Sequence, residues 1–174
     1  MPLDVTALAV RGRWLKHTQL GTPALPTRNP PPDNRWQRGE VVDALYLADS
    51  EETAWAEWYR HLAELAIPPL AQMPRELWTW QVDVEVADLA SSDQLAAIGL
   101  TPPAPGRGSW PAYQNVGEQL WREGWSGLIG PSAARPEGRV LCLFRSDDTV
   151  NGAKPLPPAR RISEPPAPPS GLRT

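Results

Sequence analysis

The sequence predicts a single α+β domain in which a small mixed β-sheet is flanked by helices. Its 174 residues are enough for one domain with a proper core, but not for two. Segments with the two-residue period of strands and segments with the helical period follow one another without regular alternation, and no internal repeat is present. This irregular order favours α+β over a regularly wound α/β fold.

A strand followed by a helix is predicted within residues 44–66. The apolar run ALYLA predicts the strand, and a helix is expected from about residue 51. Asp49, followed three residues later by Glu52, is a capping-box-like helix start. A broad apolar arc runs along the helix, and a Pro-Pro pair ends it. The two elements form one unit with polar residues at its margins.

The clearest single element is the strand predicted at 78–86, WTWQVDVEV. Its tryptophans and valines alternate with polar residues, which places one face on a core and the other in water. Such alternation favours an antiparallel or edge-like position in the sheet. The remaining expected elements are a weak helix at 88–98, a helix at 112–123 with Val116, Leu120 and Trp121 facing inward, and buried strands at 127–131 and 139–144.

The prolines divide the chain into two predicted regions. Residues 1–150 are expected to form the domain, and residues 151–174 a proline-rich tail that is extended or disordered. The stretch KPLPPARRISEPPAPPS has no apolar periodicity that would indicate a packed element.

Bulk composition excludes several classes of protein. The formal net charge of −3 argues against direct nucleic-acid binding. A single cysteine, Cys142, excludes an internal disulfide and fits a reducing compartment. No run approaches the roughly 20 apolar residues of a membrane helix, and the N-terminus reads poorly as a signal peptide. A soluble, cytoplasmic protein without membrane association is therefore expected.

Several common catalytic signatures are absent. The sequence holds no dinucleotide-binding G-x-G-x-x-G after a strand, no P-loop and no G-x-S-x-G. His17 and His61, with one cysteine, cannot build a typical zinc site. Neither a metal nor a bound prosthetic cofactor is therefore expected.

Two blocks of sequence resemble a known family. Arg35 in RWQ, Tyr46 in LYLADS and Glu57 in the following helix stand at equal intervals. Downstream, YQNVGEQLWREGWSGLIGPSA holds a Gln-x-x-Gly helix and a strand ending in Pro-Ser, at Ser132. Both blocks, in this order, resemble the RES domain, which is named for its arginine, glutamate and serine. The resemblance covers roughly residues 10–145.

The resemblance implies both a fold and an activity. RES proteins have a fold similar to that of ADP-ribosyltransferase toxins. Characterised members degrade NAD, so the resemblance implies cleavage of the nicotinamide–ribose bond by phosphorolysis, as an NAD phosphorylase, or by hydrolysis. NAD is then the substrate and inorganic phosphate the expected co-substrate. Many members are toxins held inactive by an Xre-type helix-turn-helix antitoxin, so such a partner is expected. The alternatives are an ADP-ribosyltransferase with a macromolecular acceptor and a non-catalytic module that binds a nucleotide or a partner.

Within the resemblance, Glu57, Arg35 and Ser132 are the expected catalytic residues. Cleavage of the nicotinamide–ribose bond generates an oxocarbenium-like centre, which the carboxylate of Glu57 can stabilise. Arg35 supplies a permanently cationic, forked donor to the diphosphate. Ser132 can offer its hydroxyl to phosphate or ribose. The family's Gly-Gly before the arginine is replaced here by Asp33 and Asn34, which stiffens the loop.

Arg13, Trp14 and Tyr46 are the expected substrate-binding residues. Arg13 joins Arg35 at the diphosphate, and Trp14 follows it where the family often has a tyrosine. Tyr46 can pack against the nicotinamide. Arg11 remains an alternative to Arg13, and Ser109 an alternative to Ser132.

Arg35, Tyr46 and Glu57 also have purely structural explanations. They would then be a surface ion-pair partner, a core residue and a solvated helix carboxylate. The functional hypothesis therefore depends on Arg35 and Glu57 facing each other across one cavity sized for a dinucleotide.

Overall fold

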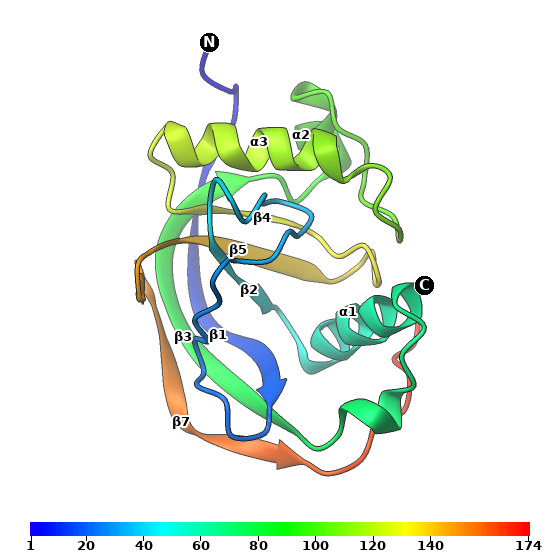
Figure 1. Ribbon diagram of the computed structural model, residues 1–174. Helices are drawn as coiled ribbons and strands as arrows, with labels where there is room; N and C mark the ends of the chain where they lie inside the picture. The colour runs from blue at the N-terminus through cyan, green and yellow to red at the C-terminus, as the bar shows by residue number, and fades with distance from the viewer.

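Three helices surround a strongly curved sheet in the computed structural model, which describes residues 1–174 (Figure 1). The strands are β1 (Ala7–Gln19), β2 (Ala44–Ala48), β3 (Arg75–Asp88), β4 (Gly127–Pro131), β5 (Arg139–Ser146), β6 (Thr149–Val150) and β7 (Ala153–Ile162). The helices are α1 (Glu51–Glu64), α2 (Ser92–Ala97) and α3 (Trp110–Arg122), with a 3-10 turn at Pro69–Gln72. The predicted single α+β domain with a mixed sheet is confirmed. No helix is both long enough and apolar enough to span a membrane.

Five strands pair in a closed circuit. β1 pairs with β2, β2 with β5, β5 with β4, β4 with β3, and β3 again with β1. Only the short β3–β4 contact is parallel. β7 adds to β3 on the side opposite β1, and β6 pairs with β5. β3 is therefore central to the sheet rather than an edge strand, although its neighbours are mainly antiparallel as predicted.

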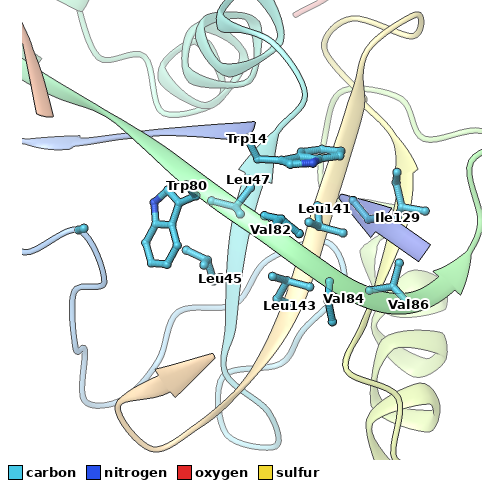
Figure 2. Packing of buried hydrophobic residues seen from close by; sticks show 12 residues of the cluster. Trp14, Leu45, Leu47, Trp80, Val82, Val84, Val86, Ile129, Leu141 and Leu143 are labelled. Carbon is cyan, nitrogen blue, oxygen red and sulfur yellow. The ribbon is translucent and has the colours of Figure 1, made fainter. Parts of the chain in front are cut away.

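The interior of this circuit is the first hydrophobic core. All five strands contribute to it, and Figure 2 shows their side chains meeting between the strands. The strand residues are Val10, Trp14, Leu45, Leu47, Trp80, Val82, Val84, Val86, Ile129, Leu141 and Leu143. This core explains the alternation in β3, whose tryptophan and valine face lies inside while its polar face lies outside.

The helices cover the outside of the circuit. α2 and α3 pack on β4 and β5, where Leu120 and Leu128 are fully buried. α1 packs through Trp55 and Trp58 against Leu77 of β3. Trp121, which was predicted to face inward, is 41% exposed because it lies one position beyond the buried stripe of α3.

The start of α1 differs from the prediction in its capping residue. Ser50, not Asp49, is the N-cap, and its hydroxyl accepts a hydrogen bond from Thr53 N at 3.2 Å. Asp49 instead accepts a hydrogen bond from Arg139 N at 2.9 Å, which ties the end of β2 to the start of β5.

The predicted tail at 151–174 is wrong for residues 153–162, which form strand β7. β7 pairs with β3 from Ala153 opposite Val82 to Ile162 opposite Arg75. Proline lacks an N–H donor and is tolerated where a strand has a neighbour on one side only. β7 is such an edge strand, so it tolerates prolines. Because of these prolines its sequence lacks the apolar period by which strands are predicted.

Candidate active site

A cavity of about 1400 Å³ lies between α1, the end of β1 and the loop that joins β1 to β2. Arg35, Tyr46 and Glu57 all line it. Its volume is above the range of about 300–1,000 Å³ that small-molecule sites usually occupy. The arginine and the glutamate that the sequence hypothesis required to share one hollow therefore do so.

The carboxylate of Glu57 is fixed by hydrogen bonds to both of its oxygens. Oε1 accepts from Ser132 Oγ at 2.6 Å and from Ala134 N at 3.3 Å. Oε2 accepts from Arg60 Nη2 at 2.9 Å and from Arg60 Nε at 3.1 Å. The Glu57 side chain is still 26% exposed, so it remains accessible to a ligand. The donors come from α1 and from the turn after β4, so two separate elements set its orientation.

Ser132 acts on Glu57 in this arrangement. It is 1% exposed, and its hydroxyl donates to Glu57 while accepting from Ala134 N at 3.2 Å and Arg135 N at 3.0 Å. These bonds use both the donor and the acceptors of the hydroxyl. The structure thus brings Ser132 to the predicted carboxylate, but it does not place it on the cavity wall.

Arg35 is buried and is held by the loop that precedes α3. Its Nη2 donates to Ala104 O at 2.7 Å and its Nη1 to Ser109 Oγ at 3.4 Å. The guanidinium also lies over the Tyr113 ring, 5.2 Å from its centroid. Arg35 forms no ion pair, so it is not the surface ion-pair partner that the sequence left open. Burial, and then the charge of Arg60, lower the pKa of Arg35 from its ordinary value.

The Gln-x-x-Gly motif of α3 holds the loop that carries Arg35. Gln114 Nε2 donates to Asn34 O at 3.0 Å and to Gln37 O at 3.2 Å. A Cβ at Gly117 would lie 1.9 Å from Trp36 O, so only glycine permits this close approach. The motif therefore fixes the backbone on both sides of Arg35.

Tyr46 supports the same loop from β2. Its hydroxyl accepts a hydrogen bond from Trp36 N at 3.3 Å, and its ring packs against the core beneath α3. Burial raises the pKa of Tyr46 well above its ordinary value, so the phenol stays protonated. Tyr46 thus has a structural role as well as a place on the cavity wall.

Arg13 and Trp14 lie outside this cavity, contrary to their predicted roles in substrate binding. Arg13 is exposed on β1, and Trp14 is 7% exposed inside the first core. The cavity borders β1 only at its end, from Leu15 to Gln19, and Arg13 and Trp14 lie before that end. The alternative, Arg11, is also exposed and pairs with Asp83 at 3.0 Å.

Other cations, which the sequence analysis did not identify, line the cavity. They are Lys16, Arg28, Arg38, Arg60, Arg75, Arg107 and Arg145. The sequence positions of two of them could have predicted a place near the site. Arg60 lies one helical turn after Glu57, and Lys16 lies two residues after Trp14. Nothing in the local sequence distinguishes Arg75 from a surface residue. The described residues contain no group of three or more His, Cys, Asp or Glu side chains able to hold a metal ion.

Comparison with known proteins yields a family and a similar fold. The RES domain model matches residues 8–163. A chain in the crystal structure of the M. tuberculosis MbcT–MbcA toxin–antitoxin complex is similar, with a TM-score of 0.75 and 21% sequence identity. The match covers 90% of this chain and 87% of that chain. No curated protein sequence matches.

Proposed function

This chain belongs to the RES domain family, and from that premise we propose that it cleaves the nicotinamide–ribose bond of NAD. The observation that carries the proposal is that Arg35 and Glu57 line one cavity from different elements. A carboxylate and a guanidinium in one cavity match the two charged ends of the reaction, a positive sugar centre and a negative diphosphate.

Glu57 stabilises the positive charge that develops on the ribose. As the C–N bond breaks, its electron pair stays with the nicotinamide nitrogen, which leaves as a neutral molecule. An oxygen of the acceptor forms the new bond to the same ribose carbon. The fixed carboxylate is already oriented by Ser132 and Arg60, so it needs little reorganisation as charge appears.

Phosphate is the acceptor that the charge of the cavity favours. Eight lysine and arginine side chains line the cavity, compared with four carboxylates, at Asp33, Glu40, Asp43 and Glu57. An excess of cations attracts a dianion and does nothing for water. We therefore infer phosphorolysis, with ADP-ribose 1″-phosphate as the product, rather than hydrolysis.

Product analysis tests the proposal. The purified protein is incubated with NAD, with and without phosphate, and the products are separated by mass spectrometry. Nicotinamide and ADP-ribose 1″-phosphate are expected, and Glu57→Gln is expected to abolish their release. Glu52→Gln is the matched control, because Glu52 is an exposed carboxylate on the same helix. Absence of nicotinamide release under both conditions would rule the activity out, whereas free ADP-ribose would identify water as the acceptor.

We also propose that the protein is the toxin of a toxin–antitoxin pair, with an Xre-type antitoxin as its partner. Family membership and the similar fold of a chain from a toxin–antitoxin complex support this. Expression in a bacterial host should arrest growth, and Glu57→Gln should remove the arrest. Co-expression of the neighbouring gene should relieve it; growth arrest by the Glu57→Gln variant would separate toxicity from the proposed chemistry.

A further inference from the structure

We propose that the end of the cavity formed by Arg75 and Lys16 is a binding site for a phosphate group. The inference deepens the proposed function. Whether the phosphate belongs to a nucleotide or is the free co-substrate is a question that rests on that function. The site itself is argued from charges that the protein leaves without partners.

Arg75 is a buried arginine with no counter-ion. It is 8% exposed, it forms no ion pair, and it lines the cavity. Its Nε donates to His17 Nδ1 at 3.0 Å, and its guanidinium lies 5.8 Å from the centroid of the Trp58 ring. Neither Nη nitrogen has a hydrogen-bond acceptor in the protein. Taking an uncompensated charge out of water costs several kcal/mol, so a buried guanidinium of this kind calls for an anion.

His17 orients this guanidinium. Burial, and then the charge of Arg75, hold the pKa of His17 well below its ordinary value, so the imidazole is neutral. Its Nδ1 is free to accept from Arg75, and its ring stacks on Trp55 at 4.9 Å between centroids. The Nε of Arg75 is thereby engaged, and the forked Nη pair is left for a ligand with two oxygens.

Lys16 is the second cation without a partner. It is half-buried on the cavity wall, with neither an ion pair nor a hydrogen bond from its ammonium group. Burial, together with the charges of Arg28, Arg75 and Arg145, lowers the pKa of Lys16 to about 8. All three arginines line the same cavity as Lys16.

The carboxylate whose charge acts on Lys16 is already engaged. The charge of Asp43 raises the pKa of Lys16, and Asp43 pairs with Arg145 at 3.2 Å. Arg28, on the facing loop, is exposed and unpaired. The cluster is thus a net positive pocket with a buried forked donor and a flexible ammonium, which fits a phosphate dianion.

The test measures phosphate binding by the free protein, without turnover. Inorganic phosphate and pyrophosphate are titrated by calorimetry and thermal unfolding, against chloride at equal ionic strength. The expected result is saturable binding and a higher Tm. Arg75→Gln should weaken binding about 10- to 100-fold, the size expected for losing hydrogen bonds to a charged group. Arg11→Gln, which removes an exposed arginine paired with Asp83, should leave it unchanged.

The test remains decisive if a variant folds poorly. Removal of an uncompensated buried charge should not lower the Tm of the protein in chloride, and circular dichroism checks the fold. Lys16→Gln is the independent second variant and should also weaken phosphate binding. The proposal is overturned if phosphate binds no better than chloride, or if both variants bind it as the wild type does.

Competition with ADP identifies the source of the phosphate. If ADP displaces inorganic phosphate and Arg75→Gln raises the KM for NAD, the site takes the diphosphate of the nucleotide. If ADP and inorganic phosphate bind at the same time, and Arg75→Gln raises the KM for phosphate instead, the site takes the free co-substrate. Phosphate binding in a protein that releases no nicotinamide would leave this site standing and remove the proposed function.

Discussion

At the scale of single residues, Arg60 connects the two charged groups of the candidate site. It bonds Glu57 on one side and donates to Glu64 Oε1 at 2.5 Å on the other. Glu64 also accepts from Gly106 N at 3.0 Å, in the loop that holds Arg35 through Ala104 O. Glu57 and Arg35 are therefore held relative to each other by hydrogen bonds along α1 and by the backbone of the loop from Ala104 to Gly106.

Arg60→Gln is expected to lower the kcat of nicotinamide release about 10- to 100-fold with little change in the KM for NAD. The reason is that a carboxylate displaced by about 1 Å loses its alignment with the sugar, while most ligand contacts remain. Steady-state kinetics measures the split between the two constants. Arg122→Gln, which removes an exposed arginine paired with the buried Glu118 on α3, should change neither. An equal rise in KM with unchanged kcat would show that Arg60 binds the substrate directly.

Lys16 predicts a pH dependence of phosphate binding. Its pKa of about 8 means that it is charged below pH 8 and loses its proton as the pH rises through 8. Besides burial, the charges of Arg28, Arg75 and Arg145 lower its pKa, and that of Asp43 raises it. Affinity for phosphate should therefore fall above pH 8, where phosphate itself is already a dianion.

The matched variant for this prediction is Lys16→Arg, because a guanidinium stays charged over the same range. Calorimetric titrations of phosphate at a series of pH values should show the fall for wild type and not for Lys16→Arg. Parallel curves for the two proteins would mean that another group controls the binding.

The predicted residues that the structure brings to one cavity are those whose chemistry and spacing coincide in the sequence. Arg35 and Glu57 share a cavity, which is the condition on which the functional hypothesis depends. Arg13 was preferred because Trp14 follows it, but β1 was not recognised as a strand, so its alternation could not be used. The alternation of a strand places Lys16 on the same face as Trp14 and Arg13 on the opposite face.

At the scale of elements, the close contact between α3 and the loop that carries Arg35 is sensitive to substitution at Gly117. Gly117→Ala would place a Cβ 1.9 Å from Trp36 O, a backbone atom that moves only with the whole loop. A loss of about 1–3 kcal/mol in the free energy of unfolding is expected from such overpacking. Nicotinamide release should fall with it, because Arg35 moves with the loop.

Urea denaturation measures the loss, and Gly108→Ala is the control because a Cβ there meets nothing within 4 Å. If Gly117→Ala were as stable as Gly108→Ala, the close approach of α3 to Trp36 would not be required for the fold.

Elements with a clear period were predictable, and those without one were not. β2, α1 and β3 have apolar residues at intervals that match their structure. β1 interrupts its inward face with Gly12, Lys16 and Thr18, two of which border the cavity. β7 is a proline-rich edge strand that buries little. In both strands, pairing with β3 outweighs local preference.

At the scale of the whole molecule, the closed circuit of strands joins segments that are distant in the sequence. β1 pairs with β3 from Ala7 opposite Ala87 to Gln19 opposite Arg75, and β2 pairs with β5. Local periodicity carries no information about such partners, so the circuit was not predictable from it. The cavity is a product of this topology, because its walls come from β1, β2, α1 and the loop between the first two, with further residues from β3, β5 and the loop before α3.

The residues that follow β7 pack against the elements that hold Glu57. Beyond β7 the chain runs along α1, and the C-terminus lies beside that helix (Figure 1). The Tyr59 hydroxyl on α1 donates to Pro166 O, and Arg173 N donates to Ala134 O at 2.7 Å. Ala134 is also a donor to Glu57, so the C-terminal segment supports the turn that orients the carboxylate.

Two truncations separate the role of β7 from that of the residues that follow it. A chain ending at Ile162 keeps the β3–β7 pairing, so it should fold, but it loses the support of Ala134. Its kcat should fall about 2- to 10-fold, which corresponds to one hydrogen bond of about 0.5–1.5 kcal/mol. A chain ending at Gly152 leaves β3 unpaired along one side, and it should aggregate or unfold because an exposed strand edge pairs with other chains. Circular dichroism, size-exclusion chromatography and the nicotinamide assay measure these outcomes. If the chain ending at Gly152 folds and releases nicotinamide as the full chain does, β7 is dispensable, and the chain beyond Gly152 behaves as the separate tail that composition predicts at 151–174.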